Sequence, residues 1–236
     1  MHSNQYADAQ RMRERIRQKR HREYVGGLWE ELGRFQLEQL ILRGLLPEHT
    51  LLDIGCGCLR GGVHFVRYLQ QGGYYGHDLH QELIEIGIAE ELAPLGLNVP
   101  RAHFQSNADF DFSAFPASFD FAVAQSLFSH LSFNDIRLCL ERLAPHMRSG
   151  GHLYATFFAL PEDQPLARAF QQQGGPKTLP HQDPYHYYPR DMEYACRGLP
   201  WSCGYLGDVG HPRGQHALLF VKRQGPAICP EHSASR

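Results

Sequence analysis

The sequence predicts an α/β fold: a three-layer sandwich whose mostly parallel seven-stranded sheet receives one antiparallel strand from a C-terminal hairpin. Three observations predict it. Short apolar runs alternate with helix-length segments between residues 50 and 160, which is the pattern of βαβ crossovers in a parallel sheet. A glycine-rich turn, Gly55-Cys56-Gly57, follows the first of these runs. Near the C-terminus two strand-like runs are joined by a turn-rich segment, which indicates a hairpin and therefore an antiparallel strand.

The elements are expected in a regular order along the chain. A mostly polar helix is expected over residues 1–24 and a second over 28–45, where apolar side chains recur at helical spacing until Gly44 and Pro47 end the helix. One further helix is expected to follow the glycine turn and to end at about residue 69, and another is expected over 79–92. A capping box of Ser132 and Asp135 indicates the start of a third. The strands are expected over residues 51–54, 73–77, 99–104, 119–124, 152–158, 201–206 and 215–222.

The length of the chain, 236 residues, suits one α/β domain with a substantial core. We therefore expect an N-terminal helical cap (residues 1–46), the α/β domain itself (47–224) and a flexible tail (225–236). An insertion at about residues 160–200, between the fifth strand and the hairpin, is expected to form a lid over a substrate.

Composition and charge exclude several classes of protein. The 23 basic and 25 acidic side chains nearly balance, so a globally basic nucleic-acid-binding protein is not indicated. No apolar run is long enough to span a membrane, and residues 1–23 lack the apolar region of a secretory signal, so we expect a cytoplasmic protein. The six cysteines form no C-x-x-C pair, which favours free thiols. His181, Asp183 and His186 match no strong zinc pattern, so no metal is expected.

The turn after the first strand is the strongest functional signal. Glycines there let the backbone pass close to a ligand, and the helix that follows directs free N–H groups toward the same place. A dinucleotide enzyme uses a G-x-G-x-x-G turn to hold a pyrophosphate, but Arg60 stands where the third glycine would be. Asp53, at the end of the strand, would repel a pyrophosphate and suits a cationic ligand. A nicotinamide dinucleotide is therefore disfavoured.

The segment Asp53-Ile54-Gly55-Cys56-Gly57 resembles the first motif of the class I S-adenosylmethionine-dependent methyltransferases, whose fold is Rossmann-like. Asp78 stands after the second strand, where an acidic side chain can accept both ribose hydroxyls. The resemblance covers roughly residues 50–160 and includes Phe119-Asp120 and Gly150-Gly151. Residues 26–36, 59–62 and 210–215 resemble a bacterial subgroup of small methyltransferases, to which we can attach no substrate.

The resemblance implies that S-adenosylmethionine is the cofactor and S-adenosylhomocysteine the product. Asn107-Ala108-Asp109 is similar to the segment of the family that contacts the adenine amino group, and the residues after the fourth strand are expected to line the cofactor. The residues expected to bind the cofactor are Asp53, Gly55, Cys56, Gly57, Asp78, Asn107, Ala108, Asp109, Gln125 and Ser126.

Candidates for the chemistry and for the methyl acceptor lie beyond the fourth and fifth strands. His130 can act as a general base because an imidazole exchanges a proton near neutral pH, although it could instead cap or pack the following helix. Aromatic side chains of the lid suit a small apolar or aromatic acceptor, although they could also form an ordinary core under a long loop. The residues expected at the acceptor are Trp29, Phe158, Tyr185, His186 and Tyr188.

We therefore expect methyl transfer to an O, N or C atom of a small molecule by in-line displacement, driven by proximity and aided by a histidine base where the acceptor carries a proton. The N/D-P-P-Y motif of enzymes that methylate adenine or amide nitrogens is absent, since Gln125-Ser126-Leu127-Phe128 stands in its place. Two alternatives are an RNA methyltransferase that grips phosphates with the arginine-rich N-terminal helix and a non-catalytic module that binds the cofactor. That helix could also cover the cofactor cleft or contact a second copy in a homodimer.

Overall fold

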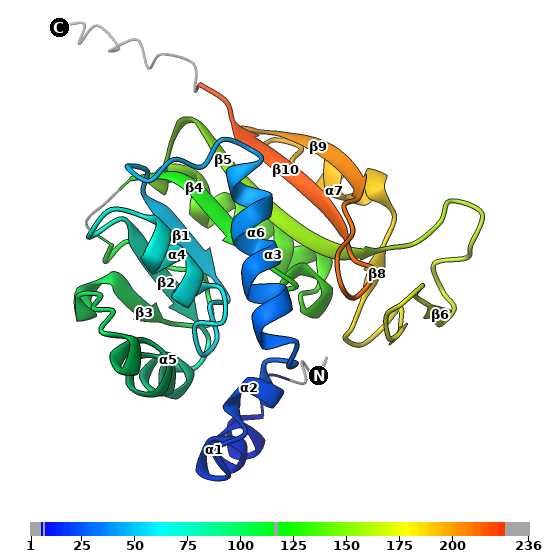
Figure 1. Cartoon of the computed structure of the whole chain (residues 1–236). Coiled ribbons are helices and arrows are strands. Elements are labelled where there is room, and N and C mark those ends of the chain that lie inside the picture. The colour runs from blue at the N-terminus through cyan, green and yellow to red at the C-terminus, as the bar shows by residue number, and fades with distance from the viewer. Residues whose placement is uncertain (1–5, 7, 116–117, 225–236) are drawn as a thin grey trace, which may run out of the picture.

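The computed structural model describes residues 6, 8–115 and 118–224, and it confirms the predicted α/β sandwich (Figure 1). The main sheet has the strand order β3-β2-β1-β4-β5-β10-β9. β10 is antiparallel to both of its neighbours, whereas the pairs formed among β1 to β5 are parallel. The strands are β1 Leu51–Ile54, β2 Tyr74–Asp78, β3 Phe104–Ser106, β4 Phe119–Ala124, β5 Met147–Ala159, β9 Trp201–Asp208 and β10 His216–Lys222.

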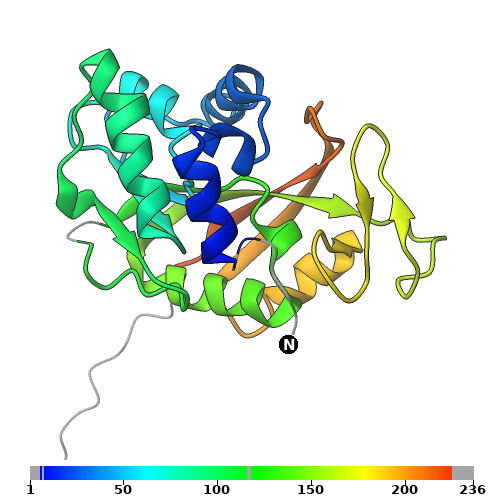
Figure 2. The same ribbon diagram turned by 90° about the horizontal axis from the view of Figure 1, so that it is seen from below.

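Helices cover both faces of this sheet (Figures 1 and 2). On one face lie α3 (Trp29–Ile41), α4 (Gly62–Tyr68) and α5 (Gln81–Gly87), which a π-helical turn over Ile88–Leu92 continues. On the other lie α6 (Phe133–Leu143) and α7 (Pro189–Ala195).

The core is divided between the two faces in the way that strand geometry requires. Successive side chains of a strand point to opposite faces. Val123 of β4 accordingly belongs to the same buried cluster as Leu40 of α3 and Phe65 of α4. Its neighbour Ala122 belongs to the cluster that contains Leu140 of α6.

The capping box predicted for α6 is present. The hydroxyl of Ser132 accepts the backbone N–H of Asp135, and the carboxylate of Asp135 accepts the backbone N–H of Ser132. These bonds fix the start of the helix directly after the turn that follows β4.

The N-terminal segment differs from the single helix expected over residues 1–24. It contains two helices, α1 (Ala9–Arg17) and α2 (His21–Tyr24), because the chain turns at Lys19, whose φ of 56° is left-handed. Met12 of α1 and Tyr24 pack against Leu83 of α5. These helices therefore lie against α5. α1 is at the lower end of the molecule in Figure 1 and faces the viewer in Figure 2.

The third strand is shorter than predicted and starts later. Residues 99–103 are not strand, because Pro100 has no N–H to donate to a neighbouring strand and Arg101–His103 form a 3-10 turn. Pairing with β2 begins only at Phe104, which lies opposite Gly76.

The segment 160–200 folds beside the end of β5. It contains the two-stranded ribbon β6 (Phe170–Gln171) and β7 (Lys177–Thr178), then β8 (His186–Tyr187), which pairs with the end of β5, and α7. We keep the name lid for residues 160–200.

The described part of the chain also bears on the expectations for membrane spans and cysteines. None of the described helices is both long and apolar enough to cross a bilayer. The described cysteines, Cys56, Cys58, Cys139, Cys196 and Cys203, are free thiols. The expected flexible tail, 225–236, lies outside the described residues.

Candidate cofactor and acceptor site

A cavity of about 780 Å³ lies beyond the carboxyl ends of β1, β2 and β4. This is the place where ligands bind in open α/β sheets. Its remaining walls come from the N-terminal segment, the lid and the loop between β9 and β10, which contribute Tyr6, Val25, Gly174, Pro176, Pro184 and Arg213. Its size falls in the range of pockets that enclose small organic ligands.

The glycine turn after β1 has the geometry that makes glycine necessary. Gly55 and Gly57 have φ values of 76° and 56°, both in the left-handed region. A Cβ at Gly57 would lie 2.9 Å from the side chain of Val25, and one at Gly55 would lie 3.2 Å from Leu127. Glycines here keep the floor of the cavity open, and both line it together with Cys56.

Asp78, at the end of β2, is tied to the glycine turn. Its carboxylate accepts the backbone N–H of Gly57 at 2.8 Å and that of His80 at 2.9 Å. Burial raises the pKa of Asp78, while these two hydrogen bonds work in the opposite direction. Because the Gly57 amide points at a carboxylate, it is not available to hold a phosphate. The turn therefore disfavours a pyrophosphate on grounds independent of Arg60.

Asp53, at the end of β1, is buried and accepts a hydrogen bond from the hydroxyl of Tyr74 at 3.0 Å. Burial raises the pKa of Asp53 to about 7. Such a carboxyl is about half-protonated near neutral pH, and a cation placed beside it would favour its charged form. Asp53 and Asp78 line the same cavity.

The loop after β3 brings two of its three expected residues to the cavity. Asn107 and Ala108 line the cavity, and the Asn107 amide holds the loop through two hydrogen bonds with the backbone of Asp111. The third, Asp109, has an exposed side chain and lies outside the cavity lining. The chain reverses at Phe110, whose φ is 56°, so Phe110 lines the cavity instead.

Gln125 and Ser126, after β4, also line the cavity as expected. Ser126 has a φ of 58° and is held by its N–H, which donates to the hydroxyl of Thr156 at 2.7 Å. The Nε2 atom of Gln125 lies 2.6 Å from Nε2 of His211, while its Oε1 atom is buried with no partner. An unpaired buried carbonyl oxygen is costly unless a ligand donates to it.

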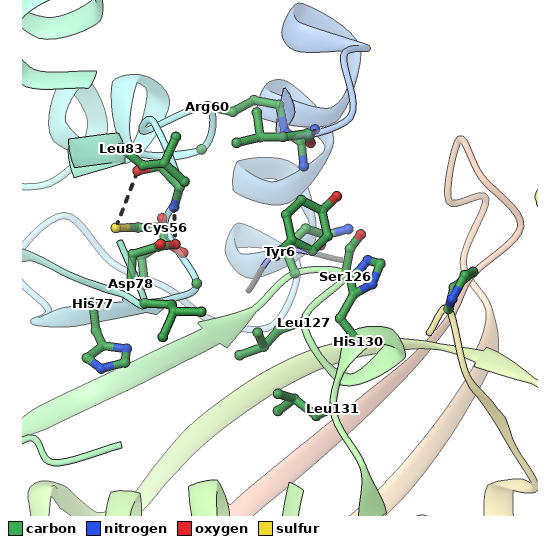
Figure 3. A pocket seen from close by; sticks show the side chains of 18 of the residues that line it. Tyr6, Cys56, Arg60, His77, Asp78, Leu83, Ser126, Leu127, His130 and Leu131 are labelled. Atoms are coloured by element: carbon green, nitrogen blue, oxygen red, sulfur yellow. Dashed lines mark hydrogen bonds between the residues drawn. The ribbon is translucent and has the colours of Figure 1, made fainter. Parts of the chain in front are cut away.

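His130 follows in a 3-10 turn, Phe128–His130, and its side chain lies beside Tyr6 and Ser126 in the cavity (Figure 3). Its Nδ1 atom lies 2.9 Å from the carboxylate of Asp183, a buried residue of the lid. The two rings of His130 and Tyr6 meet edge to face with centroids 4.7 Å apart.

The lid holds the turn on both sides of His130. The backbone N–H of Tyr185 donates to the carbonyl of Ser129 at 2.7 Å. The hydroxyl of Tyr187 donates to the carbonyl of Leu131 at 2.6 Å. Together with the Asp183 contact, the lid segment 183–187 therefore positions three successive residues of the turn.

The structure places only one of the residues expected at the acceptor in the cavity lining, namely Phe158. Tyr185 and His186 are buried in the fold, and the His186 ring bonds to Thr178 and to the Leu166 carbonyl. Tyr188 precedes α7 and donates its hydroxyl to the carbonyl of Gln164.

Trp29 likewise lies outside the cavity lining, because it stands at the start of α3 with the guanidinium of Arg22 over its ring, 4.6 Å from the centroid. These four side chains therefore lie outside the cavity lining and make contacts within the fold.

Several residues that line the cavity were missed or given no role from the sequence. Arg60 was considered as a departure from a dinucleotide motif and as part of the resembling segment 59–62. Asp183, which contacts His130 but is not part of the cavity lining, was considered only as a metal ligand. Tyr6, Arg213 and Gln215 were not singled out as site residues, although the segment 210–215 carried a family resemblance. Among the residues that the structure describes, no cluster of three or more His, Cys, Asp or Glu side chains could hold a metal ion.

Comparison with known proteins agrees with this geometry. Residues 52–153 match the family model of a methyltransferase domain. The chain is similar in structure to magnesium protoporphyrin IX methyltransferase (ChlM) from Synechocystis PCC 6803, solved with bound SAM, at 13% identity over 82% of this chain and 79% of that chain, with a TM-score of 0.57.

Two further solved structures are similar. CalS10, an amino pentose methyltransferase from Micromonospora echinaspora involved in calicheamicin biosynthesis, is 12% identical over 84% of this chain and 93% of that chain, with a TM-score of 0.61. DesVI from Streptomyces venezuelae is 16% identical over 82% of this chain and 92% of that chain, with a TM-score of 0.58. At these identities the likeness concerns the fold.

Proposed function

We propose that this chain is a class I S-adenosylmethionine-dependent methyltransferase that methylates a small molecule held in the cavity, with His130 as the general base. The observation that carries the proposal is the arrangement of the cavity lining. Two buried carboxyl groups at strand ends, Asp53 and Asp78, line the same cavity as His130. The Nδ1 atom of His130 faces the buried carboxylate of Asp183, which leaves Nε2 for the acceptor.

The residues present fit the cofactor. Its ammonium group would stabilise the charged form of Asp53, whose pKa burial raises to about 7. Each oxygen of Asp78 accepts one backbone N–H and keeps a lone pair for a ribose hydroxyl. The buried Oε1 atom of Gln125 offers an acceptor for a ligand N–H. When bound, S-adenosylmethionine supplies a methyl group activated by a positively charged sulfur.

The role proposed for His130 rests on its contact with Asp183. A carboxylate beside Nδ1 favours the tautomer that carries its proton on that atom, which leaves the lone pair on Nε2. Nε2 would then take the proton of an acceptor O–H or N–H as the acceptor attacks. The developing imidazolium would be stabilised by Asp183.

A small acceptor is favoured over RNA by the way in which the cavity is covered. Tyr6 and Val25 lie on one side of it, and Gly174, Pro176 and Pro184 of the lid contribute another wall.

Most of the N-terminal arginines that suggested an RNA contact face acidic side chains instead. Arg22 pairs with Glu91 at 2.6 Å, Arg13 with Glu82 at 3.0 Å, and Arg17 with Glu14. Charges satisfied within the fold are less available to bind phosphates.

The proposal is tested by incubating the protein with S-adenosylmethionine labelled on its methyl group, together with fractionated small-molecule extract or with total RNA. We expect label in a small-molecule fraction and release of an equal amount of S-adenosylhomocysteine. Label confined to RNA, with binding that weakens steeply with salt and is lost on removing residues 1–24, would support the RNA alternative instead. Tight S-adenosylhomocysteine binding with no labelled product from any fraction would support the non-catalytic module.

A further inference from the structure

Two guanidinium groups, those of Arg60 and Arg213, line the cavity. Arg60 lies between β1 and α4, and Arg213 in the loop between β9 and β10. Nη1 of Arg60 donates to the carbonyls of Val25 and Gly27 at 3.0 Å each, and Nη2 of Arg213 donates to the carbonyl of Gly26. Three successive carbonyls therefore hold two cations next to each other.

Among the described residues, neither cation is held by a carboxylate in an ion pair within 4.0 Å, although the charge of Asp53 acts on Arg60 from farther away. Arg60 is only 9% exposed, and its Nε atom is buried without a hydrogen-bond partner. Burial, followed by the charge of Arg213, lowers the pKa of Arg60 to about 10. A buried charge beside a second, half-buried charge of the same sign is unfavourable unless an anion compensates them.

The position of the pair relates it to the acceptor. The charges of both arginines act on the hydroxyl of Tyr6, and the ring of Tyr6 contacts that of His130. Figure 3 shows Arg60 near Tyr6 and on the opposite side of the cavity from His77. An anion held by the arginines would therefore lie on the same side of the cavity as the proposed base.

We propose that Arg60 and Arg213 form a subsite for a carboxylate group of the methyl acceptor, so that the acceptor is a small organic acid. This inference rests on the proposed function. The cofactor carries a single carboxylate, so it could compensate one of the two guanidinium charges and would leave the other for a second ligand. A guanidinium presents its donors in a planar fork that matches both oxygens of a carboxylate.

The subsite would hold the carboxylate of the acceptor, while His130 would take the proton from the acceptor atom that is methylated. The apolar side chains of Val25, Leu127 and Phe158 also line the cavity and suit the body of such an acid. A carboxylate fixed at the arginines would restrict the positions that the nucleophilic atom can take, which is how positioning accelerates a bimolecular displacement.

The test uses benzoate and its uncharged counterpart benzamide as probes of the full-length protein saturated with S-adenosylhomocysteine, with binding measured by NMR titration. We expect benzoate to bind at least about tenfold more tightly than benzamide. Arg213→Gln should weaken benzoate binding about tenfold or more and leave the affinity for S-adenosylhomocysteine within about threefold. Arg142→Gln is the matched control, because Arg142 is an exposed arginine of α6 outside the cavity lining, and it should change neither.

Three results would overturn the subsite. Benzoate and benzamide could bind equally, or Arg213→Gln could retain the preference for benzoate. Arg213→Gln could also weaken S-adenosylhomocysteine while leaving 5′-methylthioadenosine, which lacks the amino-acid portion, unaffected; this would assign Arg213 to the carboxylate of the cofactor. Each of these can occur in a protein that binds the cofactor and transfers methyl groups, so failure of the subsite is distinguishable from failure of the proposed function.

Discussion

The two halves of the cavity are built differently. The half proposed for the cofactor consists of residues at or just after the ends of strands of the sheet, such as Asp53 in β1, Asp78 at the end of β2 and Gln125 after β4. The acceptor half is assembled around His130 from segments far apart in sequence: Tyr6, Asp183 of the lid and Arg213 of the last hairpin. One half is an edge of the sheet, and the other is a set of contacts among loops.

This difference predicts how each half responds to substitution. Residues at strand ends are placed by the hydrogen bonds of the sheet, so a change there should act mainly on ligand affinity, through the contacts that the residue itself makes. In the acceptor half each residue depends on another loop, so a change should alter turnover through the geometry of a neighbour.

The largest expected effect is on turnover, at His130. His130→Ala should lower kcat about 10²–10⁴-fold for an acceptor that must lose a proton, because the general base is lost. The affinity for S-adenosylhomocysteine, measured by calorimetry, should stay within about twofold, since the base belongs to the other half. His146→Ala, outside the cavity lining, is the control. An unchanged kcat would retire His130 as the base.

The next effect is on cofactor affinity, at Asp78. Asp78→Ala removes the acceptors for two hydroxyl hydrogen bonds to a charged group, and we expect a loss of about 3 kcal/mol, or roughly 100-fold in the dissociation constant of S-adenosylhomocysteine. Asp109→Ala is a matched control, because Asp109 is exposed near the same loop and outside the cavity lining. Equal losses in both variants would contradict the assignment of the cofactor half.

A smaller effect on turnover is expected for Asp183→Asn, which tests whether the lid acts through His130. We expect kcat to fall about 30-fold, corresponding to about 2 kcal/mol for a hydrogen bond to a charged group. Nitrogen-detected NMR of His130 should show the proton on Nδ1 in the wild type and a shifted tautomer population in the variant. A merely structural role would lower the melting temperature and leave the tautomer unchanged.

The smallest expected effect is a pH dependence from Asp53. Because the pKa of Asp53 is raised to about 7, its carboxyl is mostly protonated in the ligand-free protein at about pH 6, while the ammonium of the cofactor requires the carboxylate. The affinity for S-adenosylhomocysteine should therefore rise about tenfold from about pH 6 to pH 8, and Asp53→Asn should abolish the rise.

The stability of the ligand-free protein should change in the opposite direction. The ordinary pKa of an aspartate is 3.8, so between that value and about 7 the folded state binds more protons than the unfolded state at Asp53. The contribution of this residue to the free energy of unfolding therefore falls as the pH rises through that window. Denaturant titrations of the wild type and Asp53→Asn across the window would reveal a difference of this sign or its absence.

The same contrast explains what could be predicted from the sequence. The sheet and the residues at its edge are local features: an apolar run, a glycine turn and an acidic residue stand together in the chain, so Asp53, Asp78 and Gln125 could be named as candidates. Asp109 lies outside the cavity lining, whereas its left-handed neighbour Phe110 lines the cavity, and the sequence did not indicate this conformation.

The acceptor half could not be predicted in the same way. Nothing near Asp183 in the sequence shows that it will meet His130, because the contact depends on how the whole lid packs. The aromatic side chains of Tyr185 and Tyr187 in the lid would suit the wall of a binding site. The hydroxyl of Tyr187 instead donates to the carbonyl of Leu131, and Tyr185 is buried among core residues.

The hydrogen bond from the Gly57 amide to Asp78 limits how this scaffold could be redesigned. Replacing Arg60 by glycine would complete the G-x-G-x-x-G motif of dinucleotide-binding enzymes over residues 55–60. The amide needed to cradle a diphosphate would still be bound to a carboxylate, and two buried acidic groups would still face the incoming negative charge. Conversion to a nicotinamide enzyme would therefore have to begin at the end of the second strand, not in the loop where the motif is usually sought.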